Sequence, residues 1–334
     1  MKMTAKGLLL AGAVLLGSAS ANAAPFGSAY FFGDSLTDCC AFGRTTVNNT
    51  PNWADQLPPQ IGASYTATLQ NNLAIGGAQS GNLNAVPALD TSFGAQTGFL
   101  PQVGRFVAQG TAVGPNDIAG IWIGTNDIWP SAFAAGSAPT ILGTTVNQPL
   151  GPQPSVAALT NYITGNIRAG IQTLESDGFR NIVLLSPYDL SQTGAPFSDS
   201  TTTALDAAYS TALRDADASL YTPGVNTYFV DVESLLQQVQ ANPGAYGFLH
   251  TTGVDNCQAN NCSSLSLAQQ NTYIFNDGIH FTTAFQQLIA NDAAAVINTG
   301  QTIPAPVPEP ASEALALVGL AGLGIARRAR KVAA

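Results

Sequence analysis

A serine, a histidine and an aspartate in this chain have surroundings that suit nucleophilic catalysis. Ser35 follows a short apolar run, in the stretch GDSL at Gly33–Leu36. Such a serine is either part of an ordinary strand-end turn or a nucleophile held at the tip of a strand. His280 is one of two histidines, and Asp277 stands three residues before it. An aspartate at that spacing can fix the imidazole tautomer and stabilise the imidazolium, although the same pattern also occurs as a loop aspartate near a surface histidine.

Serine hydrolysis also needs hydrogen-bond donors aimed at the oxyanion that forms on the carbonyl group. The sequence offers three candidates: the backbone N–H of Ser35, the glycine pair ending at Gly77 within NLAIGGAQS (Asn72–Ser80), and the amide of Asn126 within GTND (Gly124–Asp127). Glycine lets the backbone approach a substrate closely. Taken alone, each of these stretches could equally be a simple turn or a strand end.

Strand-like and helix-like segments alternate along the chain and would have to position these groups. Apolar runs predict strands, and apolar residues at steps of three and four predict helices. Alternation of this length favours a parallel sheet with helices on both faces, whose ligands bind beyond the carboxyl ends of the strands. The predicted strands are Ser28–Phe32, Asp117–Gly124, Asn181–Pro187 and Asn226–Val232, and the predicted helices cover 163–174, 205–220, 234–240 and 283–298.

Other features near these segments allow more than one interpretation. Ser131–Ser155 is rich in Gly, Pro, Ala and Thr and lacks periodicity, so it is either a loop over the active site or a surface insertion. Trp129, which follows the GTND stretch, could line an acyl pocket. His250 is expected to be structural or at the surface, and Asp38 and Asp127 are expected to brace turns.

The charge balance of the chain between its two end segments excludes several functions. Ala24–Pro308 holds five arginines and no lysine against eighteen Asp and Glu residues, a net formal charge of −13. It has no basic footprint for nucleic acid, and a mechanism based on a lysine Schiff base is excluded. A body of about 280 residues is most consistent with one large domain.

The four cysteines allow three disulfide connectivities. A bond between the adjacent Cys39 and Cys40 would close a strained ring and is not expected, whereas Cys257 and Cys262 would close a short loop and are the favoured pair. A zinc site is a poor alternative, because the spacing is not that of a CxxC pair. We therefore expect no metal.

The first 23 residues have the order of a secretory signal peptide. Lys2 and Lys6 precede the apolar run Leu8–Leu16, and small residues follow up to Ala23, where cleavage is predicted. A membrane anchor is the alternative, but the apolar run is short for a span.

Together, the GDSL, Gly-Gly, GTND and DxxH stretches resemble the GDSL, or SGNH, family of serine esterases and lipases. They occur in the family's order, and the resemblance covers roughly Ser28–Asn298. It implies a three-layer α/β/α sandwich with a five-stranded parallel sheet, in a hydrolase domain that we place at residues 24–302. It also implies a nucleophile at Ser35, a base and its orienting acid at His280 and Asp277, and oxyanion donors at Ser35, Gly77 and Asn126.

The sequence departs from the family pattern at two places. Phe281 follows His280 where many relatives have proline, which could alter the rigidity of the histidine loop. Cys39 and Cys40 stand where relatives often have small residues, which could link the nucleophile segment to another loop.

The carboxyl-terminal segment resembles a sorting signal. A proline-rich linker at 303–310 precedes an apolar stretch and four basic residues within 311–334. This order indicates a short membrane segment held by cytoplasmic positive charge, and a small amphipathic helix is the alternative. It resembles the PEP-CTERM signal of Gram-negative bacteria, which implies processing by an exosortase and release to the cell surface or outside. Proteins with this signal tend to accompany exopolysaccharide production.

Three functions remain as hypotheses. The first is an exported serine esterase or lipase that works through a Ser-His-Asp triad and an acyl-enzyme, without a cofactor. The second is a deacetylase that removes O-acetyl groups from an extracellular polysaccharide. The third is a surface or matrix binding protein on a hydrolase scaffold, which the complete triad disfavours. The expected partners are an ester or acylated glycan and an exosortase-type enzyme, with transient membrane contact at the inner membrane.

Overall fold

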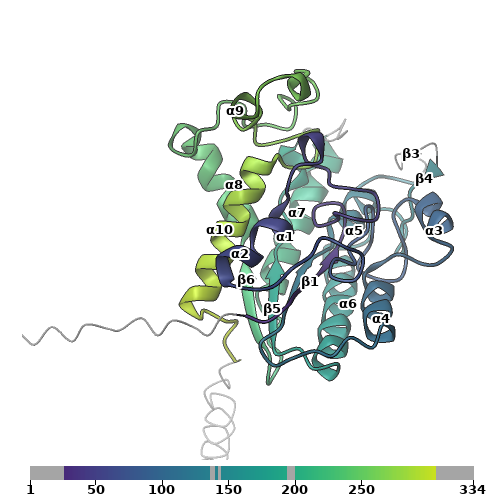
Figure 1. The fold of residues 1–334 in the computed structure, drawn as a ribbon. Helices are drawn as coiled ribbons and strands as arrows, with labels where there is room; N and C mark the ends of the chain where they lie inside the picture. Colours follow the sequence, from purple (N-terminus) through teal and green to yellow (C-terminus); the bar gives the residue numbers. More distant parts are fainter. Residues whose placement is uncertain (1–25, 136–139, 142–143, 194–199, 306–334) are drawn as a thin grey trace, which may run out of the picture.

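The computed structural model describes residues 26–135, 140–141, 144–193 and 200–305, and Figure 1 shows their helices arranged around a central sheet. The predicted signal peptide, residues 1–23, and the predicted tail, residues 311–334, lie outside the described residues, as does most of the predicted linker at 303–310. Within the described ranges, no helix is both long enough and apolar enough to cross a membrane.

Four parallel strands form the central sheet. They are β1 (Ala29–Gly33), β2 (Ile118–Trp122), β5 (Asn181–Leu185) and β6 (Asn226–Val230), in the spatial order β1-β2-β5-β6. Every residue of β1, β2 and β5 is buried, which explains why these strands are apolar runs in the sequence. The predicted strands coincide with the observed ones to within two residues at each end. Because the strands are parallel, their carboxyl ends meet at one edge of the sheet.

The fifth strand implied by the family resemblance is absent from the described residues. The segment 71–75 runs parallel to the outer edge of β1, and the Leu73 N–H donates to the Phe31 carbonyl at 2.8 Å. The segment forms only one bridge, between Phe31 and Asn72. The segment bonds β1 through three backbone hydrogen bonds, in which Asn71 accepts and Leu73 and Ile75 donate. It lacks the successive bridges of a regular strand, so the central sheet of the described residues has four strands.

Helices cover both faces of the sheet, so the predicted three-layer α/β/α arrangement is confirmed (Figure 1). Successive strand residues alternate between the two cores, and in β1 Phe31 joins one core while Phe32 joins the other. The first core includes α1 (Trp53–Gln56), α2 (Pro58–Ile61), α8 (Val232–Ala241) and α10 (Thr283–Thr299), and the second includes α4 (Phe99–Ala108), α5 (Thr125–Ser131), α6 (Val156–Ser176) and α7 (Ser200–Asp217).

The remaining elements are short. The segment predicted to lack periodicity, 131–155, begins with the last residue of α5, and its other regular structure among the described residues is an antiparallel pair of two-residue strands, β3 (Thr140–Ile141) and β4 (Thr144–Thr145). Figure 1 shows this pair next to α3 and shows α9 projecting beyond one end of α8. The other short helices are α3 (Pro87–Phe93), α9 (Leu267–Gln270) and the 3₁₀ turns Val47–Asn49, Leu190–Gln192, Pro243–Tyr246 and Cys262–Ser264.

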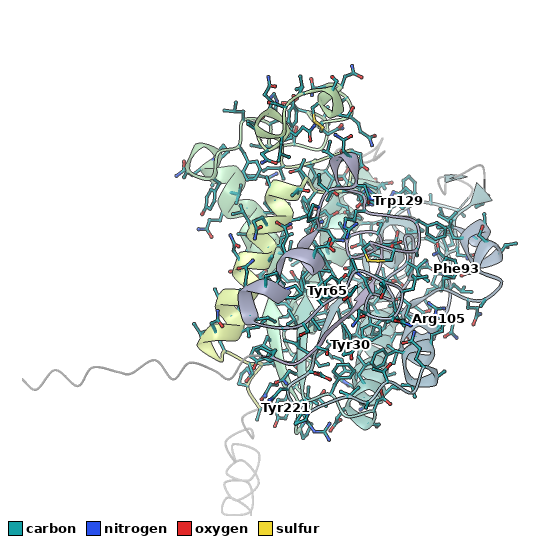
Figure 2. The ribbon with its side chains drawn as sticks, viewed as in Figure 1. Tyr30, Tyr65, Phe93, Arg105, Trp129 and Tyr221 are labelled. Atoms are coloured by element: carbon teal, nitrogen blue, oxygen red, sulfur yellow. A yellow bond between two sulfur atoms is a disulfide. The ribbon has the colours of Figure 1, made fainter. Side chains whose placement is uncertain are left out.

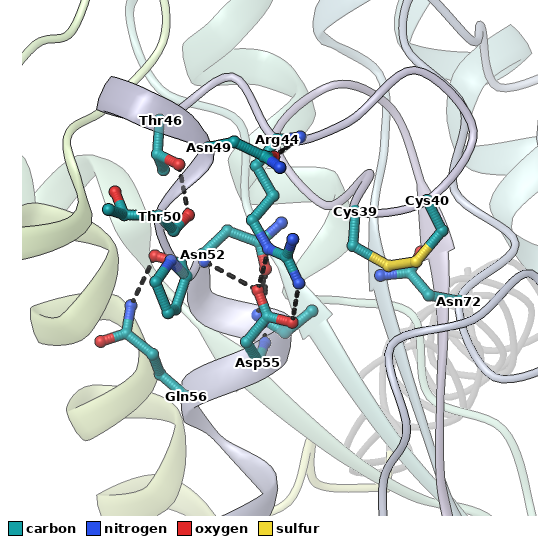
Figure 3. Close-up of polar contacts among 12 residues, drawn as sticks. Cys39, Cys40, Arg44, Thr46, Asn49, Thr50, Asn52, Asp55, Gln56 and Asn72 are labelled. Carbon is teal, nitrogen blue, oxygen red and sulfur yellow. Dashed lines mark hydrogen bonds and ion pairs between the residues drawn. A yellow bond between two sulfur atoms is a disulfide. The ribbon is translucent and has the colours of Figure 1, made fainter.

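The structure joins all four cysteines in two disulfides. Cys257 is bonded to Cys262, which is the pair that the sequence favours. Cys39 is bonded to Cys40, so the prediction against this adjacent pair is wrong (Figure 3). Asp38, the residue directly before the adjacent pair, stabilises the turn, because its carboxylate accepts the N–H of Cys40 at 2.8 Å. An argument from ring strain alone omits that support.

Candidate active site

The carboxyl ends of β1 and β2 carry two of the predicted site segments. β1 ends at Gly33 (φ 148°), where a Cβ would lie 2.3 Å from the carbonyl oxygen of Trp122. Only glycine therefore lets the chain turn so close to its neighbour strand, and Ser35 follows in this turn. β2 leads through Gly124 (φ 118°) into α5, whose second residue is Asn126. Because β1 and β2 are adjacent and parallel, Ser35 and Asn126 emerge at the same edge of the sheet.

Ser35, His280 and Asp277 form a continuous hydrogen-bonded chain. The Ser35 Oγ lies 2.8 Å from Nε2 of His280, and Nδ1 of the same ring lies 2.8 Å from Oδ2 of Asp277. The other carboxylate oxygen, Oδ1, accepts the backbone N–H groups of Ile279 and His280, both at 2.7 Å. The turn thus fixes the carboxylate, and the carboxylate fixes the ring with Nε2 toward the serine hydroxyl. A general base requires this orientation.

The histidine and the aspartate stabilise each other's charged forms. Burial lowers the pKa of His280, but the charge of Asp277 and its hydrogen bond outweigh burial and raise the pKa above its ordinary value. Burial raises the pKa of Asp277, but the charge of His280 and the hydrogen bonds from His280 and Ile279 bring it below its ordinary value. An imidazolium formed beside Asp277 would therefore be stabilised.

Residues 76–80, here called the glycine loop, and Asn126 bring hydrogen-bond donors to the same place. Gly77 has a φ of 76°, and a Cβ there would lie 2.4 Å from Oδ1 of Asn84, so the position excludes any side chain. In the described part of the chain, the backbone N–H groups of Ser35 and Gly77 have no hydrogen-bond acceptor. The Asn126 amide donates one bond to Asp34 at 3.2 Å, which leaves its second N–H for a ligand.

A cavity of about 420 Å³ opens beside these groups. Ser35, Gly77, Asn126 and His280 all line it. Trp129, labelled in Figure 2, is 7% exposed and also lines the cavity. The rest of the wall is mainly apolar and comes from Leu36, Val86, Leu89, Leu190 and Ile279, together with Thr45 and Thr125. A site of this kind combines a few convergent polar groups with a surface that suits an apolar ligand part.

Comparison with known proteins gives this site a family. The family model for GDSL-like Lipase/Acylhydrolase matches residues 30–293, which is well over half of the chain. The chain belongs to this family. A second model, for the PEP-CTERM protein-sorting motif, matches residues 306–331. Both resemblances found in the sequence are therefore confirmed.

Among curated proteins, this GDSL-like chain is similar to Lipase 1 of Photorhabdus luminescens. The two are 26% identical over 341 residues, an alignment that covers 84% of this chain and 52% of the relative, so the chain spans about half the length of that relative. Similar solved structures include an acetylxylan esterase from Geobacillus stearothermophilus, with 14% identity, 85% of this chain and 100% of that chain covered, and a TM-score of 0.40. An extracellular lipase from Streptomyces rimosus has 16% identity, 82% and 100% coverage, and a TM-score of 0.36.

Aromatic packing holds the histidine loop of this GDSL-like chain where many relatives have proline. Phe281 is fully buried, and its ring centroid lies 4.7 Å from that of Tyr188 and 4.5 Å from that of Phe285. The Tyr188 hydroxyl donates to the Ile279 carbonyl at 2.8 Å. The loop that carries His280 is thus fixed by a buried side chain and a backbone contact instead of by a proline ring.

The GDSL and GTND segments each contain a fully buried aspartate, Asp34 and Asp127. Asp34 accepts the N–H of Leu36 at 2.9 Å as well as the Asn126 amide, and it is a site residue that the sequence analysis missed. Its only sequence signal is its place between glycine and serine. Asp127 accepts the N–H and the hydroxyl of Ser80 at 2.8 and 3.0 Å and ties α5 to the glycine loop. Burial raises the pKa of each aspartate to about 7.

The other residues considered in the sequence lie outside the cavity. Nδ1 of His250 lies 2.8 Å from Oδ2 of Asp255, and the ring stacks on Tyr273 with centroids 3.9 Å apart. None of the described residues of 131–155 lines the cavity. Across the described ranges, no group of three or more His, Cys, Asp or Glu residues is placed to hold a metal ion.

Proposed function

We propose that this chain is an exported serine hydrolase that cleaves carboxylic esters. The observation that carries the proposal is the hydrogen-bonded chain from Ser35 through His280 to Asp277, at the wall of a cavity that Gly77 and Asn126 also line. Nucleophile, base and orienting acid within hydrogen-bond reach are the signature of acyl transfer through a covalent intermediate. Membership of the GDSL-like lipase/acylhydrolase family supports the same reaction.

The reaction begins with attack of the Ser35 Oγ on the ester carbonyl carbon. His280 takes the hydroxyl proton on Nε2, and Asp277 stabilises the resulting imidazolium. The carbonyl oxygen becomes an oxyanion, which accepts hydrogen bonds from the backbone N–H groups of Ser35 and Gly77 and from the Asn126 amide. These donors need no rearrangement, because neither backbone N–H has another acceptor in the described residues.

The intermediate then collapses in two stages. The bond to the leaving alcohol breaks as His280 returns its proton to the alcohol oxygen, which leaves an acyl-enzyme on Ser35. Water enters, gives a proton to His280 and attacks the acyl carbon. A second collapse releases the carboxylic acid and restores the serine hydroxyl.

The cavity wall supports an apolar acyl part in the substrate. Val86, Leu89, Leu190 and Trp129 surround the space beside Ser35. Burial of methylene groups contributes about 0.8 kcal/mol each, so an acyl chain gains affinity until it fills the cavity. We propose that Trp129 belongs to the acyl-binding wall.

Hydrolysis of p-nitrophenyl esters from acetate to palmitate tests this function. Wild-type protein should turn over part of the series, and Ser35→Ala should abolish turnover while keeping the melting temperature. A fluorophosphonate probe should label Ser35 in the wild type only. A folded wild-type protein that hydrolyses no ester and takes up no probe would refute the proposal and favour a binding role.

A polysaccharide O-deacetylase is the second candidate, and the sorting motif at residues 306–331 favours it. Proteins with that motif tend to accompany exopolysaccharide, which would place acetylated glycans within reach. Acetate release from an O-acetylated polysaccharide, compared with turnover of long-chain esters, separates the two candidates. A lipase prefers the long chains, whereas a deacetylase acts on acetyl groups alone.

Export and sorting complete the proposal. We propose that residues 1–23 are removed as a signal peptide and that 24–302 form the hydrolase domain. The linker 303–310 and the tail 311–334 would make transient contact with the inner membrane and be processed by an exosortase-type enzyme. Intact-mass measurement of protein from the producing cells checks both cleavages, since each removes a defined segment.

A further inference from the structure

The turn after the proposed nucleophile is built around one buried carboxylate. Asp38 is 1% exposed and accepts four backbone N–H groups. Its Oδ1 accepts those of Cys40 and Ala41 at 2.8 and 2.9 Å. Its Oδ2 accepts the N–H of Phe42 at 3.2 Å and, from a different loop, the N–H of Gly76 at 3.0 Å. Asp38 therefore joins the loop that carries Ser35 to the glycine loop.

A second buried side chain fixes the next peptide of the glycine loop. Nδ2 of Asn84 donates to the Gly76 carbonyl at 2.8 Å, and its Oδ1 accepts the N–H of Val86 at 2.8 Å. The Gly76 carbonyl and the Gly77 N–H belong to one planar trans peptide, so they point in opposite directions. A bond that fixes the carbonyl therefore also fixes the direction of the N–H.

These contacts act at short range. A Cβ on Gly76 would lie 3.8 Å from Oδ2 of Asp38 and 3.9 Å from Cβ of Ser35, so the three groups are in near contact. The Cys39–Cys40 disulfide lies in the same turn and limits its movement (Figure 3). A change in either side-chain bond would shift the Gly77 N–H relative to the Ser35 Oγ.

We propose that Asp38 and Asn84 are positioning residues that hold the Gly76–Gly77 peptide, so that the Gly77 N–H is aimed at the oxyanion formed on Ser35. This inference rests on the proposed ester hydrolysis, since it assigns the supports of one oxyanion donor. Neither side chain lines the cavity, so neither contacts the substrate. Their effect passes through the peptide alone.

The residue types are required by the direction of each hydrogen bond. A carboxylate accepts on both oxygens, whereas asparagine accepts on one and donates from the other. Asp38→Asn would leave one pair of N–H donors facing an NH₂ group. Asn84→Asp would place an acceptor against the Gly76 carbonyl. Asn84→Asp keeps the shape of the side chain and breaks the bond to the Gly76 carbonyl. Asp38→Asn also keeps the shape and breaks the bonds of one donor pair, either Cys40 and Ala41 or Phe42 and Gly76, so residue 38 no longer holds both loops at once.

Two matched substitutions at the amino ends of β2 and β5, away from the proposed site, serve as controls. Asp117 is also buried and accepts the N–H groups of Ser28 and Gly114 at 2.6 and 2.8 Å. Asn181 is buried and donates to the carbonyls of Pro115 and Asp117 at 3.1 and 3.2 Å. Asp117→Asn and Asn181→Asp therefore repeat the same chemical change in a turn that does not touch the glycine loop.

The experiment measures kcat and KM on p-nitrophenyl acetate, the Ki of a trifluoromethyl ketone, and the melting temperature of the full-length chain. The Ser35 hydroxyl adds to the carbonyl carbon of such a ketone. The oxyanion of the resulting hemiketal accepts hydrogen bonds from the same donors as the oxyanion of the transition state. Asp38→Asn and Asn84→Asp should each lower kcat at least tenfold, with KM within about threefold, and raise Ki in parallel. Asp117→Asn and Asn181→Asp should lower the melting temperature and leave kcat and Ki close to wild type.

Each outcome decides the inference. Wild-type values of kcat and Ki in the two site variants would overturn it, as would losses no larger than those of the controls, which indicate a purely structural role. If one site variant does not fold, the other decides by the same criteria. A wild-type protein that neither hydrolyses the ester nor binds the ketone refutes the proposed function instead, so the two failures are distinguishable.

Discussion

Two histidine–aspartate pairs in this chain share one geometry and differ in their surroundings. In both, Nδ1 of the ring lies 2.8 Å from Oδ2 of the carboxylate. His280 and Asp277 have side chains that are 20% and 26% exposed, whereas those of His250 and Asp255 are 31% and 49% exposed. Nε2 of His280 meets the Ser35 hydroxyl, while the His250 ring lies flat on Tyr273. A histidine–aspartate pair therefore does not by itself identify a catalytic base, because a nucleophile and oxyanion donors must also lie beside the histidine.

The largest expected difference between the two pairs is the effect of removing each histidine on kcat. His280→Ala should lower kcat for p-nitrophenyl acetate by about 10³-fold or more, because the base and its proton transfers are lost. His250→Ala should keep kcat within twofold of wild type. Turnover assays and thermal melts on both variants check this. Comparable losses of kcat in both variants would show that the contact with Ser35 is not what distinguishes the His280 pair from the His250 pair.

The amide beside each pair offers the next test. Asn126→Ala should lower kcat by about 10²–10³-fold, since it removes one oxyanion donor. Asn260→Ala is the counterpart, because Asn260 donates to Asp255 at 2.8 Å and does not line the cavity beside Ser35. Steady-state kinetics on the two variants should show a loss only in the first. Full activity in Asn126→Ala would remove that residue from the proposed oxyanion site.

The pH dependence of kcat/KM measures the pKa of His280 in the free enzyme. Only neutral imidazole can take the Ser35 proton, so kcat/KM should fall about tenfold for each pH unit below the pKa of His280. Asp277 raises that pKa, so the loss should begin above the ordinary histidine value of about 6.5. Asp277→Asn should move the midpoint to lower pH, which separates His280 from Asp34, whose pKa is about 7. A midpoint that Asp277→Asn leaves unchanged would assign the titration to another group.

The smallest effect is expected at the exposed pair. Asp255→Asn should change the free energy of unfolding by less than about 1 kcal/mol, because solvent screens an ion pair with this exposure. Urea denaturation of the variant and the wild type measures the difference. A loss of several kcal/mol would mean that the loop segment that contains His250 and Asp255 depends on this contact for its folding.

The sequence was sufficient to predict the strands and the residues that the fold brings together. The strands β1, β2 and β5 are buried on both faces, so their apolar runs were unambiguous. Ser35 and His280 were found because they stand in short stretches with recognisable order. The fold places them 2.8 Å apart, and their proposed roles still await the kinetic tests.

The parts that could not be predicted depend on contacts distant in sequence or on details of backbone geometry. Asp34 supports Asn126 from a position 92 residues earlier, and no local pattern marks that contact. The segment 71–75 lies beside β1 and bonds it, but it does not form a regular fifth strand, and the family resemblance does not show this detail of backbone geometry. The Cys39–Cys40 bond was not expected because the support from Asp38 is absent from an argument about the ring alone.

Gly33 and Gly77, which both adopt a positive φ beside the proposed site, also limit how this protein can be re-engineered. A Cβ at position 33 would meet the Trp122 carbonyl at 2.3 Å, and one at position 77 would meet Asn84 at 2.4 Å. In a mutant library selected for folded enzyme, both codons would return to glycine whatever substrate is used for selection. Variation aimed at a new acyl chain belongs at Val86, Leu89 and Leu190, where the wall can change without moving the backbone.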